Sequence, residues 1–236
     1  MMTDLFSSFD PSLIQTSSNT QSLNTLLIWL ANLIPIFAIQ SFLWIAPTRT
    51  SQILSVPMTI MNDQMSRTLG KSIKGMTSII SPLFLFLILT NWTGLIPYVL
   101  PASSHLLFTL SFGLPLWLAL MISSAKNSIS SFTAALLPEG APDWLNPFLT
   151  LAETISIMVR PATLSFRLAA NMSAGHIVLA LMGSYIISLL LIQNISLFII
   201  LMPAHMGYIL FEVAMGMIQA FIFCLLLSMY SEDHSH

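Results

Sequence analysis

Three charged side chains recur at intervals of seven along one apolar stretch of the chain. Glu153, Arg160 and Arg167 lie in a segment from about 146 to 187 that is helical by composition. Because an α-helix advances 100° per residue, a step of seven rotates the position by only about 20°. An unbroken helix therefore carries all three charges in one stripe, although a kink at Pro161 could shift the phase between its two halves.

The last apolar stretch carries a second polar pair. Glu212 and Gln219 are again seven apart, and His176 stands nine residues after Arg167. Ionisable groups inside a membrane cost about 2.5–3.5 kcal/mol each on insertion scales, so each needs a reason. Arginine keeps its proton under accessible conditions, whereas histidine and desolvated carboxylates can exchange protons near neutral pH. One fixed cation beside several exchangeable groups predicts a path for protons.

The composition places these groups in a membrane. Only 7% of the 236 residues are charged and 56% are hydrophobic, against ~25% charged residues in soluble domains. Uncharged gaps of 38, 51 and 44 residues precede Arg49, Lys126 and Glu212, and each gap exceeds the ~20 residues of one membrane crossing. We therefore expect an all-α, polytopic membrane protein, and we exclude a water-soluble globule and a β-barrel.

The elements that must position the polar groups follow from the charge gaps and from the apolar periodicity. We expect a single membrane-embedded domain with about five membrane-embedded helices. Its expected parts are an N-terminal tail (1–21), a first span (22–46), an amphipathic surface helix (49–75), a helical hairpin (76–125), a loop (126–145), two long, strongly tilted helices (146–230) and a C-terminal tail (231–236).

The surface helix also predicts an orientation. Arg49, Arg67, Lys71 and Lys74 outweigh Asp63 within it. The positive-inside rule places such a segment on the side from which the protein was inserted, and the N-terminus on the opposite side. Five crossings then place the C-terminus opposite the N-terminus.

Three segments of the sequence together resemble subunit a of the rotary, proton-translocating ATP synthase, in its mitochondrial form. They are TNWTGLIPY (90–98), ETISIMVRPATLSFRLAANMSAGHIV (153–178) and FEVAMGMIQAFIF (211–223). The RLxxNxxAGH core followed by a helix with glutamate and glutamine is highly specific, because it fixes a charge and its neighbours inside a span. The resemblance extends over nearly the whole chain from the first span onward.

The resemblance implies a role for the arginine and for the titratable groups. Arg167 is expected to face the rotating ring of subunit c, whose carboxylates carry protons, and to prevent a leak between two offset half-channels. His176 and Glu212 are expected to line the half-channel that takes protons up, while Glu153 and Asp233 line the one that releases them.

The resemblance also implies polar support, partners and a location. Asn171 and Gln219 are expected close to the arginine. The implied partners are the ring, other stator subunits of the peripheral stalk, protons and the lipid bilayer. The implied location is the mitochondrial inner membrane, with the N-terminus on the intermembrane-space side and the C-terminus on the matrix side.

Several activities are not expected of this chain. It should be a non-catalytic subunit without cofactor or metal. Nucleic acid is not an expected partner, because four of the seven basic residues fall in one short segment. No nucleotide should bind, because Gly70 and Lys71 form the only Gly-Lys pair and lack the upstream glycine of a phosphate-binding loop.

Two other classes of protein remain as alternatives. A haem-binding respiratory subunit could be equally apolar, but His105, His176 and His205 show no paired-ligand spacing. A self-contained ion transporter is disfavoured by the lack of an internal repeat. The roles of Arg160, His105 and His205 stay open at this point.

Overall fold

The computed structural model describes residue 30 and residues 33–40, 49–68, 75–96, 99, 101–127 and 145–233. Every regular element in these ranges is helical, which confirms the all-α prediction. The elements are α2 (Ile34–Gln40), α3 (Arg49–Arg67), α4 (Met76–Gly94), the 3₁₀ turn η4 (Ala102–Ser104), α5 (Leu106–Asn127), α7 (Asn146–Ile192) and α8 (Ile195–Asp233).

Four of the described helices, α4, α5, α7 and α8, are long and apolar enough to cross a membrane. They account for the predicted hairpin and for the predicted helix pair, and α8 extends to Asp233, inside the predicted C-terminal tail. Most of the predicted first span at 22–46 lies outside the described residues, as does most of the predicted loop at 126–145. The tail at 1–21 also lies outside them.

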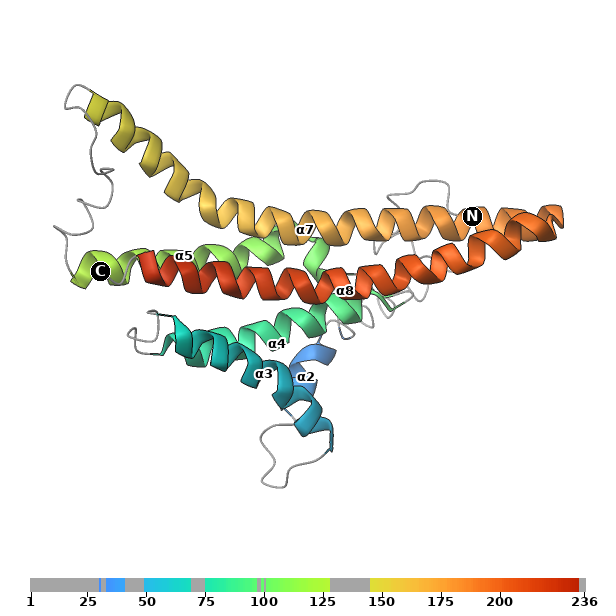
Figure 1. Ribbon diagram of the computed structural model, residues 1–236, viewed down its shortest axis with the longest axis horizontal. Coiled ribbons are helices and arrows are strands. Elements are labelled where there is room, and N and C mark those ends of the chain that lie inside the picture. The colour runs from blue at the N-terminus through green and yellow to red at the C-terminus, as the bar shows by residue number, and fades with distance from the viewer. Residues whose placement is uncertain are drawn as a thin grey trace, which may run out of the picture.

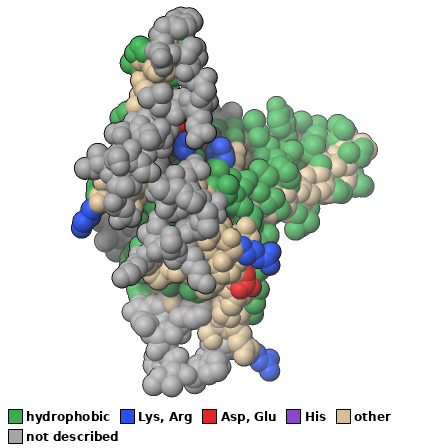
Figure 2. Space-filling view, turned by 60° about the vertical axis from the view of Figure 1, so that its left-hand side comes forward, with side chains coloured by type: hydrophobic (Ala, Val, Ile, Leu, Met, Phe, Trp, Pro, Cys, Tyr) green, Lys and Arg blue, Asp and Glu red, His purple; other side chains and the backbone are tan. Residues whose placement is uncertain are grey.

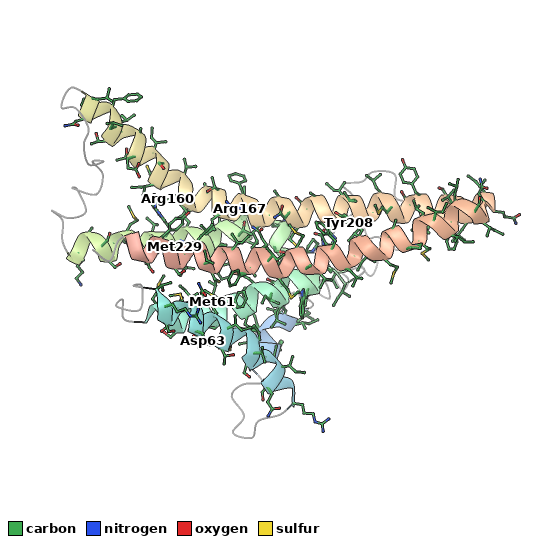
Figure 3. All side chains as sticks on the ribbon, viewed as in Figure 1. Met61, Asp63, Arg160, Arg167, Tyr208 and Met229 are labelled. Atoms are coloured by element: carbon green, nitrogen blue, oxygen red, sulfur yellow. The ribbon has the colours of Figure 1, made fainter. Side chains whose placement is uncertain are left out.

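Helices α7 and α8 form a long antiparallel hairpin that runs the length of the molecule (Figure 1). Their 47 and 39 residues correspond to about 70 Å and 58 Å at 1.5 Å per residue. A hydrocarbon core of ~30 Å cannot hold such helices upright and straight, so they must tilt or bend. The helix α7 continues through Pro161 and bends beside Arg160, where its first part turns away from α8 (Figure 3).

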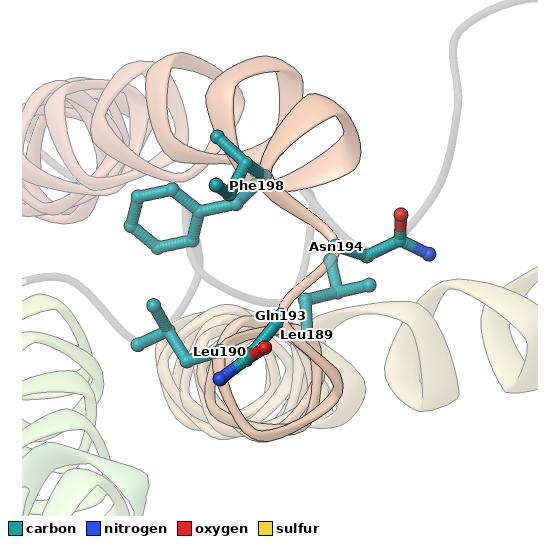
Figure 4. Close-up of a pocket in the computed structure, with 6 residues that line it drawn as sticks. Leu189, Leu190, Gln193, Asn194 and Phe198 are labelled. Carbon is teal, nitrogen blue, oxygen red and sulfur yellow. The ribbon is translucent and has the colours of Figure 1, made fainter.

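A two-residue turn closes the hairpin. Gln193 adopts the left-handed conformation with φ 59°, its N–H donates to the Leu190 carbonyl, and the N–H of Asn194 donates to the Leu189 carbonyl. This pair of bonds satisfies carbonyls at the end of α7 and reverses the chain at once. The turn borders an open pocket of about 360 Å³, which is lined by Leu189, Leu190, Gln193, Asn194, Ile195 and Phe198 (Figure 4).

The other helices pack against this hairpin in layers. Helix α5 packs along α7, α4 packs along α8, and α3 packs on the far side of α4 (Figure 1). Their contacts form one apolar core. Its largest fully buried members include Met61 and Met65 of α3, Ile80 of α4, Leu168 of α7 and Phe223 of α8.

Helix α3 covers Arg49–Arg67 of the segment 49–75 that was predicted as an amphipathic surface helix. Met61 and Met65 are fully buried, while Asp63 and Arg67 of the same helix are exposed. Residues 69–74 lie outside the described part of the chain.

The outer surface of the molecule is apolar. Large hydrophobic side chains are exposed along α7 and α8, among them Leu191 at 80% and Leu210 at 70%. Figure 2 shows such side chains covering the projecting end of this hairpin. Soluble proteins rarely expose apolar patches of this extent, whereas lipid covers them at no cost.

Candidate functional site

Asn171 of α7 and Gln219 of α8 join the two long helices through their side chains. The Asn171 Nδ2 donates to the Gln219 Oε1 at 3.0 Å, across 48 residues of sequence. Gln219 is only 4% exposed, so an amide without a partner there would be costly. The hydrogen bond fixes the register of the hairpin one helical turn beyond Arg167.

Glu212 occupies the next contact along the same pair of helices. Its side chain is only 4% exposed, and its carboxylate lies directly against Gly175 of α7. A Cβ added at Gly175 would overlap this carboxylate, so the glycine provides the space in which it lies. His176 follows Gly175 and is half-buried. The structure thus brings the predicted uptake residues Glu212 and His176 to one level of the hairpin.

Arg167 differs from these residues because it lies on an outer face of the hairpin. Its side chain is exposed, as are those of Phe166 and Ala170 beside it, whereas Leu168 is fully buried. Among the described residues, no hydrogen bond or ion pair within the chain engages the Arg167 guanidinium. A permanent cation inside an apolar span requires an anionic partner or water, and this one is directed to the outside of the chain.

The predicted release residue Glu153 lies in the first part of α7 and pairs with Arg160. Arg160 Nη2 is 3.8 Å from Glu153 Oε1, and their side chains are 27% and 40% exposed. The guanidinium carbon of Arg160 also lies 5.2 Å from the ring centre of Tyr230 on α8. Asp233 is the last residue of α8, three positions after Tyr230, and its side chain lies outside the described part of the chain.

The predicted stripe of charges is therefore divided between two roles. Glu153 and Arg160 neutralise each other beside the end of α8, whereas Arg167, one further step of seven along α7, makes no such pair within the described chain. The bend at Pro161 falls between the pair and Arg167.

Sequence reasoning missed Asn91 of α4. This side chain is fully buried, and its Nδ2 donates to the Gly216 carbonyl of α8 at 3.0 Å. The bond falls on α8 between Glu212 and Gln219, so it fixes the position of the segment that carries both. Asn91 belongs to the segment TNWTGLIPY, inside a predicted apolar span. A polar amide in such a span was the signal that could have identified it.

The fold and the site together define a class of protein. The chain is a polytopic α-helical membrane protein whose buried polar groups follow the contact between two long helices, with one cation on the outer face of that pair. Ionisable and polar groups held inside membrane spans in this way are typical of proteins that move ions through a membrane.

Comparisons with known proteins identify the family. The sequence pattern of the family "ATP synthase A chain" matches residues 22–232. The chain is 36% identical to "ATP synthase subunit a" of Locusta migratoria, over 99% of each chain. It is also 36% identical to that of Artemia franciscana, and 33% identical to "ATP synthase F(0) complex subunit a" of Rhopalosiphum padi. Both of these alignments cover 99% of this chain and 100% of the relative's own length. The chain therefore belongs to the ATP synthase A chain family.

Proposed function

We propose that the chain is the proton-conducting stator subunit in the membrane sector of an ATP synthase. Family membership supports this role, and so does the course of the polar groups along the contact between α7 and α8. Each proton that crosses the membrane potential releases ~2.3 kcal/mol per 100 mV. Through this subunit, that energy turns a partner rotor and is delivered to nucleotide sites elsewhere in the complex.

The rotor that fits this surface is a ring of small subunits with one carboxylate each. The single observation that supports it best is the exposed Arg167, which has no anionic partner in the described chain. A guanidinium attracts an arriving carboxylate into its ionised form, and its permanent proton blocks transfer straight across. The exposed Ala170 and Ala174 beside it are small, which lets another helix approach closely.

Two half-channels follow from the same assignment. Protons are taken up past His176 and Glu212 to the ring, are carried round, and are released past Glu153 and Asp233. Asn171 and Gln219 hold the two helices together beside Arg167. Other stator subunits are needed to keep this subunit stationary against the torque of the ring.

The location proposed is the mitochondrial inner membrane, because the animal relatives match over their whole length. The N-terminus lies on the intermembrane-space side and the C-terminus on the matrix side. Attachment of a membrane-impermeant label to each end, in intact and in inverted vesicles, tests the orientation. Labelling of both ends from the same side would contradict it.

A site-specific cross-link tests the partner. The native Cys224 is fully buried, so an A170C variant presents one accessible thiol beside Arg167. We expect this thiol to cross-link to cysteines placed next to the ring carboxylate in the assembled complex. The control is I122C on the outer face of α5, where Ile122 is 65% exposed. Equal cross-linking of the two variants, or none from A170C, would refute the assignment.

A further inference from the structure

On the side that faces α7, helix α8 carries polar side chains that the proposed uptake path does not use. His205 and Tyr208 precede Glu212 by seven and four residues, and Gln219 follows it by seven. At 100° per residue these four positions fall within about 60° of one another. They form one stripe on the side of α8 that carries the contacts with Asn171 and Gly175.

The two additional side chains are less exposed than most of the residues beside them on α8. Tyr208 is half-buried and interacts with the Glu212 carboxylate one turn away, where α7 and α8 run side by side (Figure 3). His205 is also half-buried, and its Nδ1 is a buried atom without a hydrogen-bond partner in the described part of the chain. By contrast, Met206 is 59% exposed and Leu210 is 70% exposed.

The distance that a half-channel must cover gives this stripe a function. Half of the hydrocarbon core is ~15 Å thick, and a tilted helix needs a longer path to cover that depth. Glu212 lies seven residues from Gln219, or about 10 Å along the axis, so it does not reach the surface. Tyr208 and His205 continue the stripe to about 16 Å and 21 Å from Gln219.

We propose that His205 and Tyr208 form the outer part of the uptake half-channel and relay protons from solution to Glu212. This inference rests on the proposed function and extends it by two residues. The His205 imidazole takes a proton from a hydronium ion on the uptake side, which leaves neutral water. A water molecule then carries that proton to the Tyr208 oxygen while the tyrosine's own hydroxyl proton moves to the Glu212 carboxylate. Tyr208 ends neutral, and the net change is one proton moved inward.

Proton flux through the assembled complex in membrane vesicles tests the relay. The variants are Y208F, which removes only the hydroxyl, and H205Q, which removes the exchangeable imidazole. We expect each to slow flux about ten-fold, the rate equivalent of one hydrogen bond to a charged group. We also expect an altered ratio of rates in light and heavy water, which a purely structural role would not change.

The controls make the same two substitutions, Tyr to Phe and His to Gln, at exposed positions outside the stripe, where they should not change proton flux. Tyr185 is 62% exposed on α7, and His105 is exposed before α5, so Y185F and H105Q should conduct normally. Flux is expressed per assembled complex. If Y208F does not assemble, the flux of H205Q alone tests the relay. Normal flux in Y208F and H205Q with slow flux in E212Q overturns the relay only. Normal flux in E212Q overturns the proposed uptake path itself.

Discussion

The carboxylate of Glu212 on α8 lies in the space that a side chain at Gly175 on α7 would occupy. The reason for a glycine here is the neighbouring carboxylate and not the backbone conformation, because the backbone at Gly175 is helical. The absent Cβ allows a carboxylate to be buried between two helices.

The variant G175A should displace this carboxylate. The added methyl group overlaps the Glu212 carboxylate. That carboxylate is the end of a flexible side chain, so it should move out of its position at a small cost in stability. We expect proton flux to fall while some complex still assembles. At Gly183 of the same helix, a Cβ would meet no atom within 4 Å, so G183A is the matched control. Equal flux in the two variants would contradict the argument.

The hydrogen bond between Asn171 and Gln219 predicts an asymmetric pair of mutants. N171L leaves the buried Gln219 amide without a partner and should cost ~1–3 kcal/mol. Q219L leaves the Asn171 amide without its partner, but this amide is half-buried and water can reach it, so the loss of stability should be smaller. The heat stability of the subunit in the complex measures both. The double variant should be more stable than the sum of the single effects predicts, and strict additivity would exclude the bond as a stabilising contact.

The contact of Arg160 with both Glu153 and Tyr230 predicts a graded series. The ion pair is partly exposed, so R160Q should lower stability by at most ~1 kcal/mol. R160K keeps the charge but loses the planar group that stacks on an aromatic ring, so it should fall between wild type and R160Q. Y230F should behave like wild type, because the ring remains. If R160K were as unstable as R160Q, the charge would not contribute.

The buried tether from Asn91 to Gly216 predicts a large effect on stability from an uncharged side chain. N91L removes the only amide that joins α4 to α8 in the described structure and should destabilise the subunit by ~1–3 kcal/mol. Asn62 on α3 is exposed, so N62L should stay within ~0.5 kcal/mol of wild type. The melting temperatures of complexes assembled with N91L and with N62L measure this difference. Similar melting temperatures would show that the Asn91 hydrogen bond does not stabilise the subunit.

Local patterns in the sequence predicted much of this arrangement. Gaps between charges predicted the spans, and the spacing of seven predicted that Glu153 and Arg160 share a face, where they pair at 3.8 Å. Whether α7 passes through Pro161 could not be predicted, because a proline either kinks or ends a helix depending on its neighbours. Here the helix continues and bends.

Contacts between distant segments were beyond prediction for a different reason. The Asn91 bond spans 125 residues, and such a contact depends on how α4 docks on α8 rather than on either segment. Among the small residues that follow Arg167, Ala169 and Gly175 are buried while Ala170 and Ala174 are exposed. Only the packed structure separates the face of α7 that α5 and α8 cover from the face that stays exposed.

Arg167 predicts a loss of function without a loss of structure. Its side chain is exposed and makes no hydrogen bond or ion pair within the described residues, so R167A should change stability by no more than ~0.5 kcal/mol. Under the proposed function, coupled proton transport should nevertheless be abolished, because the variant loses the cation that would ionise an arriving carboxylate and block transfer straight across. R49A is the control, since Arg49 is an exposed cation at the start of α3. Normal ATP synthesis by R167A complexes would contradict the assignment. Loss of the subunit from the complex would instead show that the arginine acts in assembly.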